Sequence, residues 1–127
     1  DGLQLGYGLG EDSVDEDLET FFVKYTVGGI TAAFQRSELD GAGSSSDEDS
    51  DALGVSFAIN ENLSVSYGTH DVDFGAANKA DEESSGVSAS YTMGSMTITG
   101  ISNSTDNVAG SDASNDAYRE VTIAFAF

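Results

Sequence analysis

Apolar residues alternate with small or polar ones at a period of two, and this pattern recurs along the whole sequence. Leu53, Val55 and Phe57, for example, alternate with Gly54 and Ser56. Such alternation is typical of β-strands whose two faces meet different surroundings, since successive side chains point to opposite sides. Eight segments carry it: 2–9, 20–28, 30–39, 52–59, 63–73, 85–94, 96–105 and 117–127. The 127 residues therefore predict an all-β, antiparallel meander in a single domain, 1–127.

The connections between these segments alternate between short and long. Three are expected to be tight hairpin turns: Gly28-Gly29, Asn60-Glu61-Asn62 and Gly94-Ser95. Four are expected to be loops of about ten residues or more, and 18 of the 23 acidic residues lie in 10–19, 39–51, 73–84 and 105–116. Because alternate connections lie at the same end of a meander, one end should be strongly acidic and the strands nearly neutral.

The composition excludes several classes of function. A net charge of −19 opposes binding to the phosphates of nucleic acid. The absence of cysteine excludes disulfides and thiol chemistry. A Ser-His-Asp site could be drawn around His70, but Ser and Asp are so abundant that their spacing carries no information. We therefore expect a protein that is not an enzyme.

The strands have the length and composition of a membrane wall. No run of 18 apolar residues is present, which excludes a membrane-spanning helix but not a barrel of strands. Eleven residues, as in 63–73, cover roughly 25 Å at ~3.3 Å per residue and a tilt near 45°. The chain contains no proline, so every strand amide can pair. The pattern predicts a transmembrane β-barrel meander, with a soluble acidic β-sandwich as the alternative.

The last strand ends on alternating apolar residues, Val121, Ile123, Phe125 and the terminal Phe127. This run resembles the C-terminal strand of Gram-negative outer-membrane proteins, in which it serves as the signal for the barrel assembly machinery. Residues 54–68 and 87–97 resemble late hairpins of general porins from alphaproteobacteria of the Rhodobacter and Roseobacter kind. The resemblance covers most of the chain.

The resemblance implies an outer-membrane, water-filled trimer of sixteen-stranded barrels, through which ions and small hydrophilic solutes diffuse passively. This chain would be the C-terminal eight strands. Its inward residues, such as Ser64, Ser66 and Gly68, are too small to fill the interior of a closed eight-stranded barrel. Two alternatives remain: a complete eight-stranded outer-membrane barrel with a structural or adhesion role, and a secreted acidic cation-binding β-domain.

A few polar residues fall on the inward parity, where an ionised group at membrane depth requires water. The candidates for lining the pore are Lys24, Gln35, His70 and Glu120. Arg36 and Arg119 fall on the outward parity near the outer ends of their strands. They could meet lipopolysaccharide phosphates or, as we favour, pair with the acidic loops.

The acidic clusters are candidate sites for loosely held Ca²⁺ or Mg²⁺, because neighbouring carboxylates repel one another unless cations intervene. The candidate metal ligands are Asp12, Asp15, Asp17, Asp47, Asp49 and Asp51. The second cluster starts like an EF-hand loop but has Ala52 and Ala58 where such a loop needs Gly and Glu, so no such site is expected. A solvated rim screened by salt is the alternative; either rim should concentrate cations and give a mild cation preference.

Overall fold

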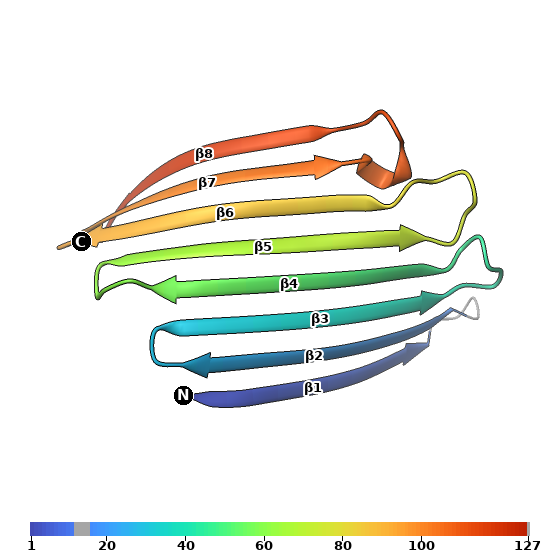
Figure 1. The fold of residues 1–127 in the computed structure, drawn as a ribbon, viewed down its shortest axis with the longest axis horizontal. Helices are drawn as coiled ribbons and strands as arrows, with labels where there is room; N and C mark the ends of the chain where they lie inside the picture. Colours follow the sequence, from blue (N-terminus) through green and yellow to red (C-terminus); the bar gives the residue numbers. More distant parts are fainter. Residues whose placement is uncertain (12–15, 127) are drawn as a thin grey trace.

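The structure is a computed structural model, and it describes residues 1–11 and 16–126. Eight antiparallel strands form one sheet in which spatial order follows chain order (Figure 1). The number and order of the predicted strands are confirmed. They are β1 (Gly2–Glu11), β2 (Asp17–Val27), β3 (Ile30–Asp40), β4 (Glu48–Ala58), β5 (Leu63–Phe74), β6 (Glu82–Met93), β7 (Met96–Asp106) and β8 (Asp116–Phe125).

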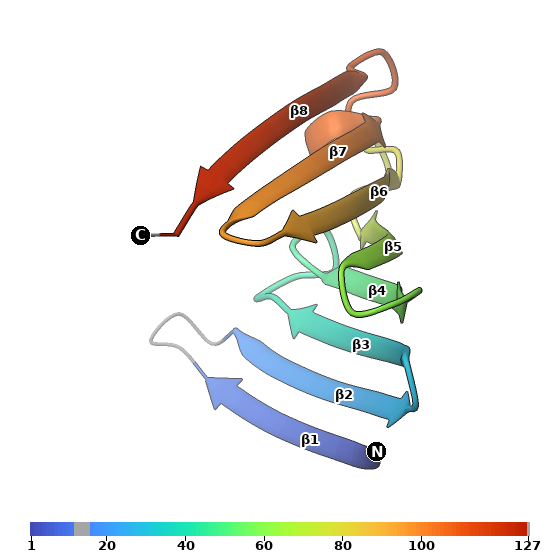
Figure 2. The ribbon, with the colours of Figure 1, turned by 90° about the vertical axis from the view of Figure 1, so that its left-hand side faces the viewer.

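The sheet is a single curved layer that does not close (Figure 2). Among the described residues, β1 pairs only with β2 and β8 only with β7, so each leaves one edge unpaired. In the described ranges, the one helical element is a short 3-10 turn, η1 (Val108–Gly110), between β7 and β8. Val72, which is 6% exposed, is the only buried apolar side chain in the described part of the chain. The sheet thus has no core of its own.

Several strands extend further into the acidic segments than the sequence predicts. β4 begins at Glu48 instead of residue 52, which puts Asp49 and Asp51 inside a strand. Its pairing with β3 continues through Glu38 opposite Asp49 and Leu39 opposite Glu48. The prediction that Asp49 and Asp51 lie in a loop is therefore wrong. Both side chains are partly exposed to solvent and lie beside the Arg36 guanidinium, which offsets the cost of placing these charges in a strand. The connections after β3, β5 and β7 shrink to 41–47, 75–81 and 107–115, below the predicted ten residues.

Two of the tight turns depend on glycine. Gly28 and Gly94 adopt φ values of +55° and +62°, in the left-handed region that other residues reach only at a cost. The third turn uses a side chain instead, since Asn60 Oδ1 accepts hydrogen bonds from the amides of Asn62 at 2.9 Å and Leu63 at 3.0 Å. All three lie at the end opposite the acidic connections (Figure 1).

The long connections contact one another at their shared end. The Gly75 amide donates to the Asp47 carbonyl at 2.8 Å, which joins the β5–β6 connection to the β3–β4 connection. The Ala80 amide donates to the Gly110 carbonyl at 3.1 Å, which joins it to the β7–β8 connection. Lys79 lies 4.1 Å from the ring centroid of Phe74. Three connections therefore form a linked rim.

Candidate functional site: two unlike faces of one sheet

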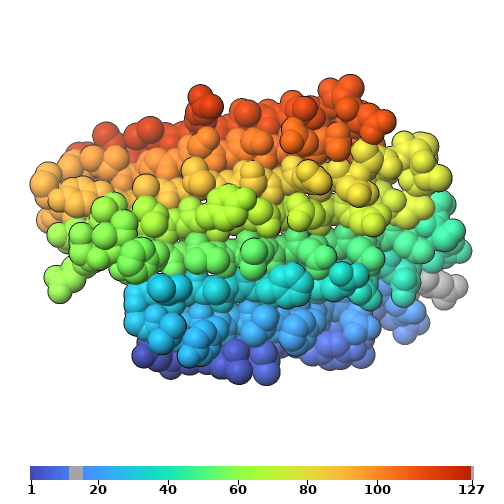
Figure 3. Space-filling model, in the orientation of Figure 1, coloured from blue at the N-terminus to red at the C-terminus, as the bar shows by residue number. Residues whose placement is uncertain are grey.

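One face of the sheet carries most of the large apolar side chains, and no second layer covers it. Val55, Phe57 and Tyr67 share this apolar face and are 41%, 44% and 50% exposed. Figure 3 shows the strands lying side by side as one layer on the side that it views. In a soluble sandwich such residues would be packed against another sheet. Here the apolar face is the one left open.

On β4 and β6 the opposite, polar face is the more enclosed one. Along β6, every residue of the polar face is half-buried and every residue of the apolar face is exposed. Ser84, Ser88 and Ser90 belong to the first set and Val87 and Tyr91 to the second. Because side chains converge on the inside of a curved sheet, this pattern places the polar face on the concave side.

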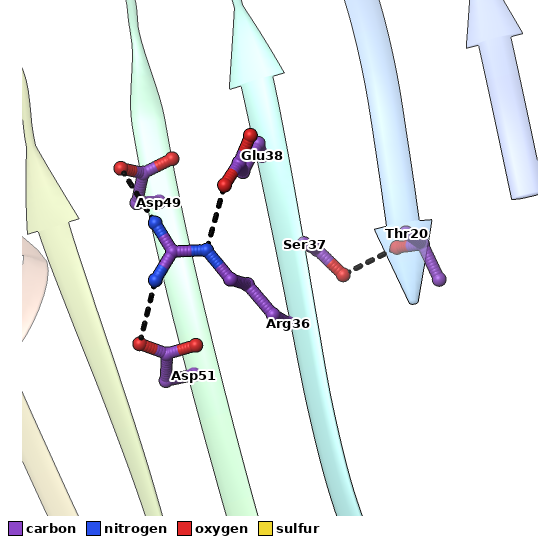
Figure 4. A network of polar contacts seen from close by, with 6 residues as sticks. All are labelled: Thr20, Arg36, Ser37, Glu38, Asp49 and Asp51. Atoms are coloured by element: carbon purple, nitrogen blue, oxygen red, sulfur yellow. Dashed lines mark hydrogen bonds and ion pairs between the residues drawn. The ribbon is translucent and has the colours of Figure 1, made fainter. Parts of the chain in front are cut away.

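Hydroxyl groups pair across neighbouring strands on the polar face. They lie at distances of 2.8 to 3.1 Å in the pairs Ser66–Ser88, Ser84–Thr105, Ser90–Thr99, Thr92–Thr97 and Thr26–Thr31. Thr20 and Ser37 make a further contact of this kind (Figure 4). A hydroxyl has one donor and two acceptor positions, so each pair retains capacity for water. The concave face therefore carries small, polar side chains that can bind water.

The four residues expected to line a pore all lie on this polar face. Gln35 and His70 belong to one row of cross-strand partners, each opposite Ala52 of β4. Lys24 lies opposite Ala33, and Glu120 lies opposite Ile101. The sequence parity therefore places them correctly relative to one another, and their role at a pore stays a prediction.

Glu120 is held in place by its own strand. Its carboxylate accepts hydrogen bonds from Thr122 Oγ1 at 2.7 Å and from the Tyr118 hydroxyl. All three side chains belong to the polar face of β8, two residues apart from one another. The negative charge is thus fixed at one height of the concave face.

Phe22 is an aromatic residue on the polar face that the sequence analysis did not identify. It lies opposite Gly6, and a Cβ on that glycine would lie 1.9 Å from the ring atom Cε1. The ring therefore covers the glycine instead of projecting into the concavity, as aromatic residues do beside glycines of edge strands. The sequence could have identified Phe22, because sides alternate along β2 and a residue between the apolar-face residues Phe21 and Val23 must lie on the polar face.

The apolar side chains form a band that crosses the strands obliquely. On the apolar face of each strand, going towards the acidic end, the last non-polar residue before the first polar one is, from β1 to β8, Leu9, Phe21, Phe34, Leu53, Tyr67, Val87, Gly100 and Val121. Followed from partner to partner across the sheet, Val121 of β8 is level with Asp1, just before β1. Asp1 lies eight residues below Leu9, which marks the band edge on β1. The band edge thus shifts steadily in one direction from strand to strand.

This shift measures how far the strands tilt relative to the band. Eight residues over the seven steps from β1 to β8 give a tilt of about 40°, with ~3.3 Å per residue and ~4.8 Å between strands. Strands of transmembrane barrels tilt by roughly 35–45°. The band edge therefore gives a strand tilt within the range of transmembrane barrels.

The band also fixes the heights of the polar-face candidates. Lys24 lies between the band residues Val23 and Tyr25, inside the apolar layer. Gln35 and Glu120 lie at its upper edge, and His70 lies three residues above Tyr67. Of the four, Lys24 is therefore the residue that lies deepest within the band.

Arg36 lies above the band on the apolar face and pairs with three carboxylates (Figure 4). Its guanidinium nitrogens lie 2.6 Å from Glu38, 3.4 Å from Asp49 and 3.2 Å from Asp51. The expectation that Arg36 pairs with the acidic loops holds for Asp49 and Asp51 of the predicted loop 39–51, but the structure places both acids on β4 and adds Glu38 of β3. Arg119, by contrast, makes no ion pair with any described residue, so the same expectation is not met there.

The candidate metal ligands divide into two groups. Asp12 and Asp15 lie outside the described residues, and Asp17 begins β2. Asp49 and Asp51 contact Arg36, and Asp47 Oδ1 accepts a hydrogen bond from the Gly41 amide at 3.1 Å. Within the described ranges, no three His, Asp or Glu side chains are grouped to hold a metal. Cation binding by the loops stays a prediction.

The C-terminal residues Val121, Ile123 and Phe125 share the apolar face and are all exposed. Phe127 lies outside the part of the chain that is described. The alternation expected of an assembly signal is present through Phe125, and its recognition stays a prediction.

No helix in the described residues is both long and apolar enough to cross a membrane. Comparison of the chain with known protein families, curated proteins and solved structures gives no match. The two unlike faces and the oblique apolar band are therefore the observations from which a function can be inferred.

Proposed function

We propose that this chain forms half of the wall of a sixteen-stranded outer-membrane porin, a water-filled channel for small hydrophilic solutes and ions. The observation that carries the proposal is the inverted arrangement of the sheet: its apolar face is exposed and its polar face is the enclosed, concave one. Lipid tails cover the first face and water fills the space beside the second. The resemblance of the last strand to outer-membrane proteins supports the same location.

The amount of exposed apolar surface supports a membrane environment. Among the described residues, 22 large apolar side chains are exposed. Soluble monomers rarely expose contiguous apolar patches of more than a few hundred Å². The oblique band adds an independent argument, because a tilt of about 40° is what a barrel wall between two membrane surfaces requires.

The open edges of β1 and β8 favour half of a large barrel over a closed eight-stranded one. Backbone amides and carbonyls at a sheet edge must find partners inside a membrane. We propose that strands outside this sequence pair with both edges and complete a barrel that assembles as a homotrimer. The small polar side chains of the concave face then border water and need not fill an interior.

The charges suggest a mild preference for cations. The acidic rim, with Asp47, Asp81 and Asp112 among its members, attracts cations to the entrance. Lys24 and Glu120 contribute opposite charges to the channel wall, one inside the apolar layer and one at its edge. Enzymatic chemistry has no part in this proposal.

Conductance of the full-length protein in a planar lipid bilayer tests the proposal. We expect stepwise, ohmic openings and a reversal potential in a salt gradient that indicates cation preference, which declines as ionic strength rises. Lys24→Glu should shift the reversal potential further toward cations, whereas Arg36→Gln, on the other face, should leave it nearly unchanged. Membrane-inserted protein that gives no steps would contradict the proposal and favour a structural barrel. Protein that stays in solution without detergent would instead favour a secreted acidic domain.

A further inference from the structure

A hollow of the apolar face lies over strands β5 to β8. A groove of about 590 Å³ lies there, with Val65, Val87 and Val121 among its walls. Ala89 and Gly100 lie beside each other at its floor, where larger residues would fill it. A Cβ added to Gly100 would meet no atom within 4 Å, so the space above this residue is empty. The volume is within the ~300–1,000 Å³ of pockets that hold small ligands.

Arg119 lines the upper end of this groove. It lies two residues beyond Val121, just above the edge of the apolar band, and its cross-strand partner is Ser102. The next row above consists of uncharged residues, since Ser104 lies opposite Ala117. The guanidinium has no ion-pair partner among the described residues, whereas Arg36 on the same face has three.

We propose that this groove binds one anionic lipid of the surrounding bilayer, with an acyl chain between the valines and the headgroup phosphate on Arg119. The inference rests on the proposed membrane location of the apolar face. Charge complementarity favours a lipid phosphate, because a free guanidinium donates paired hydrogen bonds to phosphate oxygens. The heights agree as well: the apolar part of the groove lies within the band and the charge lies above it, at the level of headgroups.

The test uses the full-length protein in nanodiscs made of equal parts phosphatidylglycerol and phosphatidylcholine. Native mass spectrometry counts the lipids that each protein molecule retains on release. We expect the wild type to retain phosphatidylglycerol with about a tenfold preference, the effect of one charge-assisted hydrogen-bond pair. Arg119→Gln should abolish the preference. Gly100→Leu should reduce retention of both lipids by filling the groove.

Two matched variants control for unspecific effects. Arg36→Gln removes a cation from the same face but should leave the preference unchanged, since Arg36 is already paired. Gly54→Leu adds the same bulk on the polar face, where a Cβ also meets no atom within 4 Å, and should leave lipid retention unchanged.

Three outcomes would overturn the inference. An unchanged preference for phosphatidylglycerol in Arg119→Gln means that the groove does not bind the phosphate. A change in the number of associated copies in Gly100→Leu, without a change in lipid retention, means that a second copy of the chain covers the groove. Failure of the wild type to float with vesicles would overturn the proposed function itself, and this separate measurement distinguishes the two failures.

Discussion

Replacing Val55 by arginine probes the face that we assign to lipid. Val55 is 41% exposed on the apolar face, between Ala32 and Tyr67 on the neighbouring strands. It lies four residues from Asp51, which is the first charged residue of the apolar face on β4. It also lies four residues from Ile59, at the turn that follows β4. At ~3.3 Å per residue and a tilt of about 40°, each distance corresponds to roughly 10 Å of height. Val55 is therefore near the middle of the apolar layer.

An arginine near the middle of the layer costs about 2–4 kcal/mol on the lipid face of a barrel, and about 0–1 kcal/mol near the interface. We therefore expect Val55→Arg to lower the free energy of unfolding by about 2–4 kcal/mol. The assay is urea unfolding of the full-length protein in lipid vesicles, followed by circular dichroism.

Two substitutions serve as controls for Val55→Arg. Ser56→Arg adds the same side chain one residue away on the polar face, and Thr69→Arg adds it on the apolar face above the band edge. Both should cost about 1 kcal/mol or less. Equal losses for Val55→Arg and Ser56→Arg, or a larger loss for Ser56→Arg, would refute the assignment of the faces.

Three further predictions concern the turns and the packing of the sheet. Gly94→Ala should cost about 1–2 kcal/mol of unfolding free energy because of its positive φ, whereas Gly100→Ala should not; equal costs would contradict this. Gly6→Ala should destabilise the protein by displacing the Phe22 ring, and the loss should shrink when Phe22→Ala is also present; additive losses in this double-mutant cycle would argue against the contact. Arg36→Gln should lower the melting temperature at low salt but much less at 1 M salt, where exposed ion pairs are screened; a loss that does not depend on salt would show that Arg36 acts through packing.

The period of two was enough to predict the eight strands and their two faces. This succeeded because the backbone fixes the side of each residue, so Val55 and Ser56 could be assigned before any pairing was known. The glycine turns were also readable, since Gly28 and Gly94 supply the positive φ of tight hairpins.

Strand ends and side-chain partners were harder to predict. Asp and Glu are uncommon in strands, so the pairing of Glu38 with Asp49 could not be inferred from composition. The contrast between Arg36 and Arg119 depends on register: Arg36 lies opposite Asp51, whereas Arg119 lies opposite Ser102. The groove beside Arg119 likewise forms only when Ala89 and Gly100 meet across two strands.

Cysteine scanning along β6 tests the central claim most directly, because the chain has no native cysteine. Single cysteines from Ser84 to Tyr91 would be exposed, in the full-length protein in vesicles, to a maleimide that does not enter lipid. We expect labelling at the even positions, Ser84, Gly86, Ser88 and Ser90, and protection at Val87, Ala89 and Tyr91. Uniform labelling, or labelling of the odd positions instead, would contradict a wall with lipid on one side and water on the other.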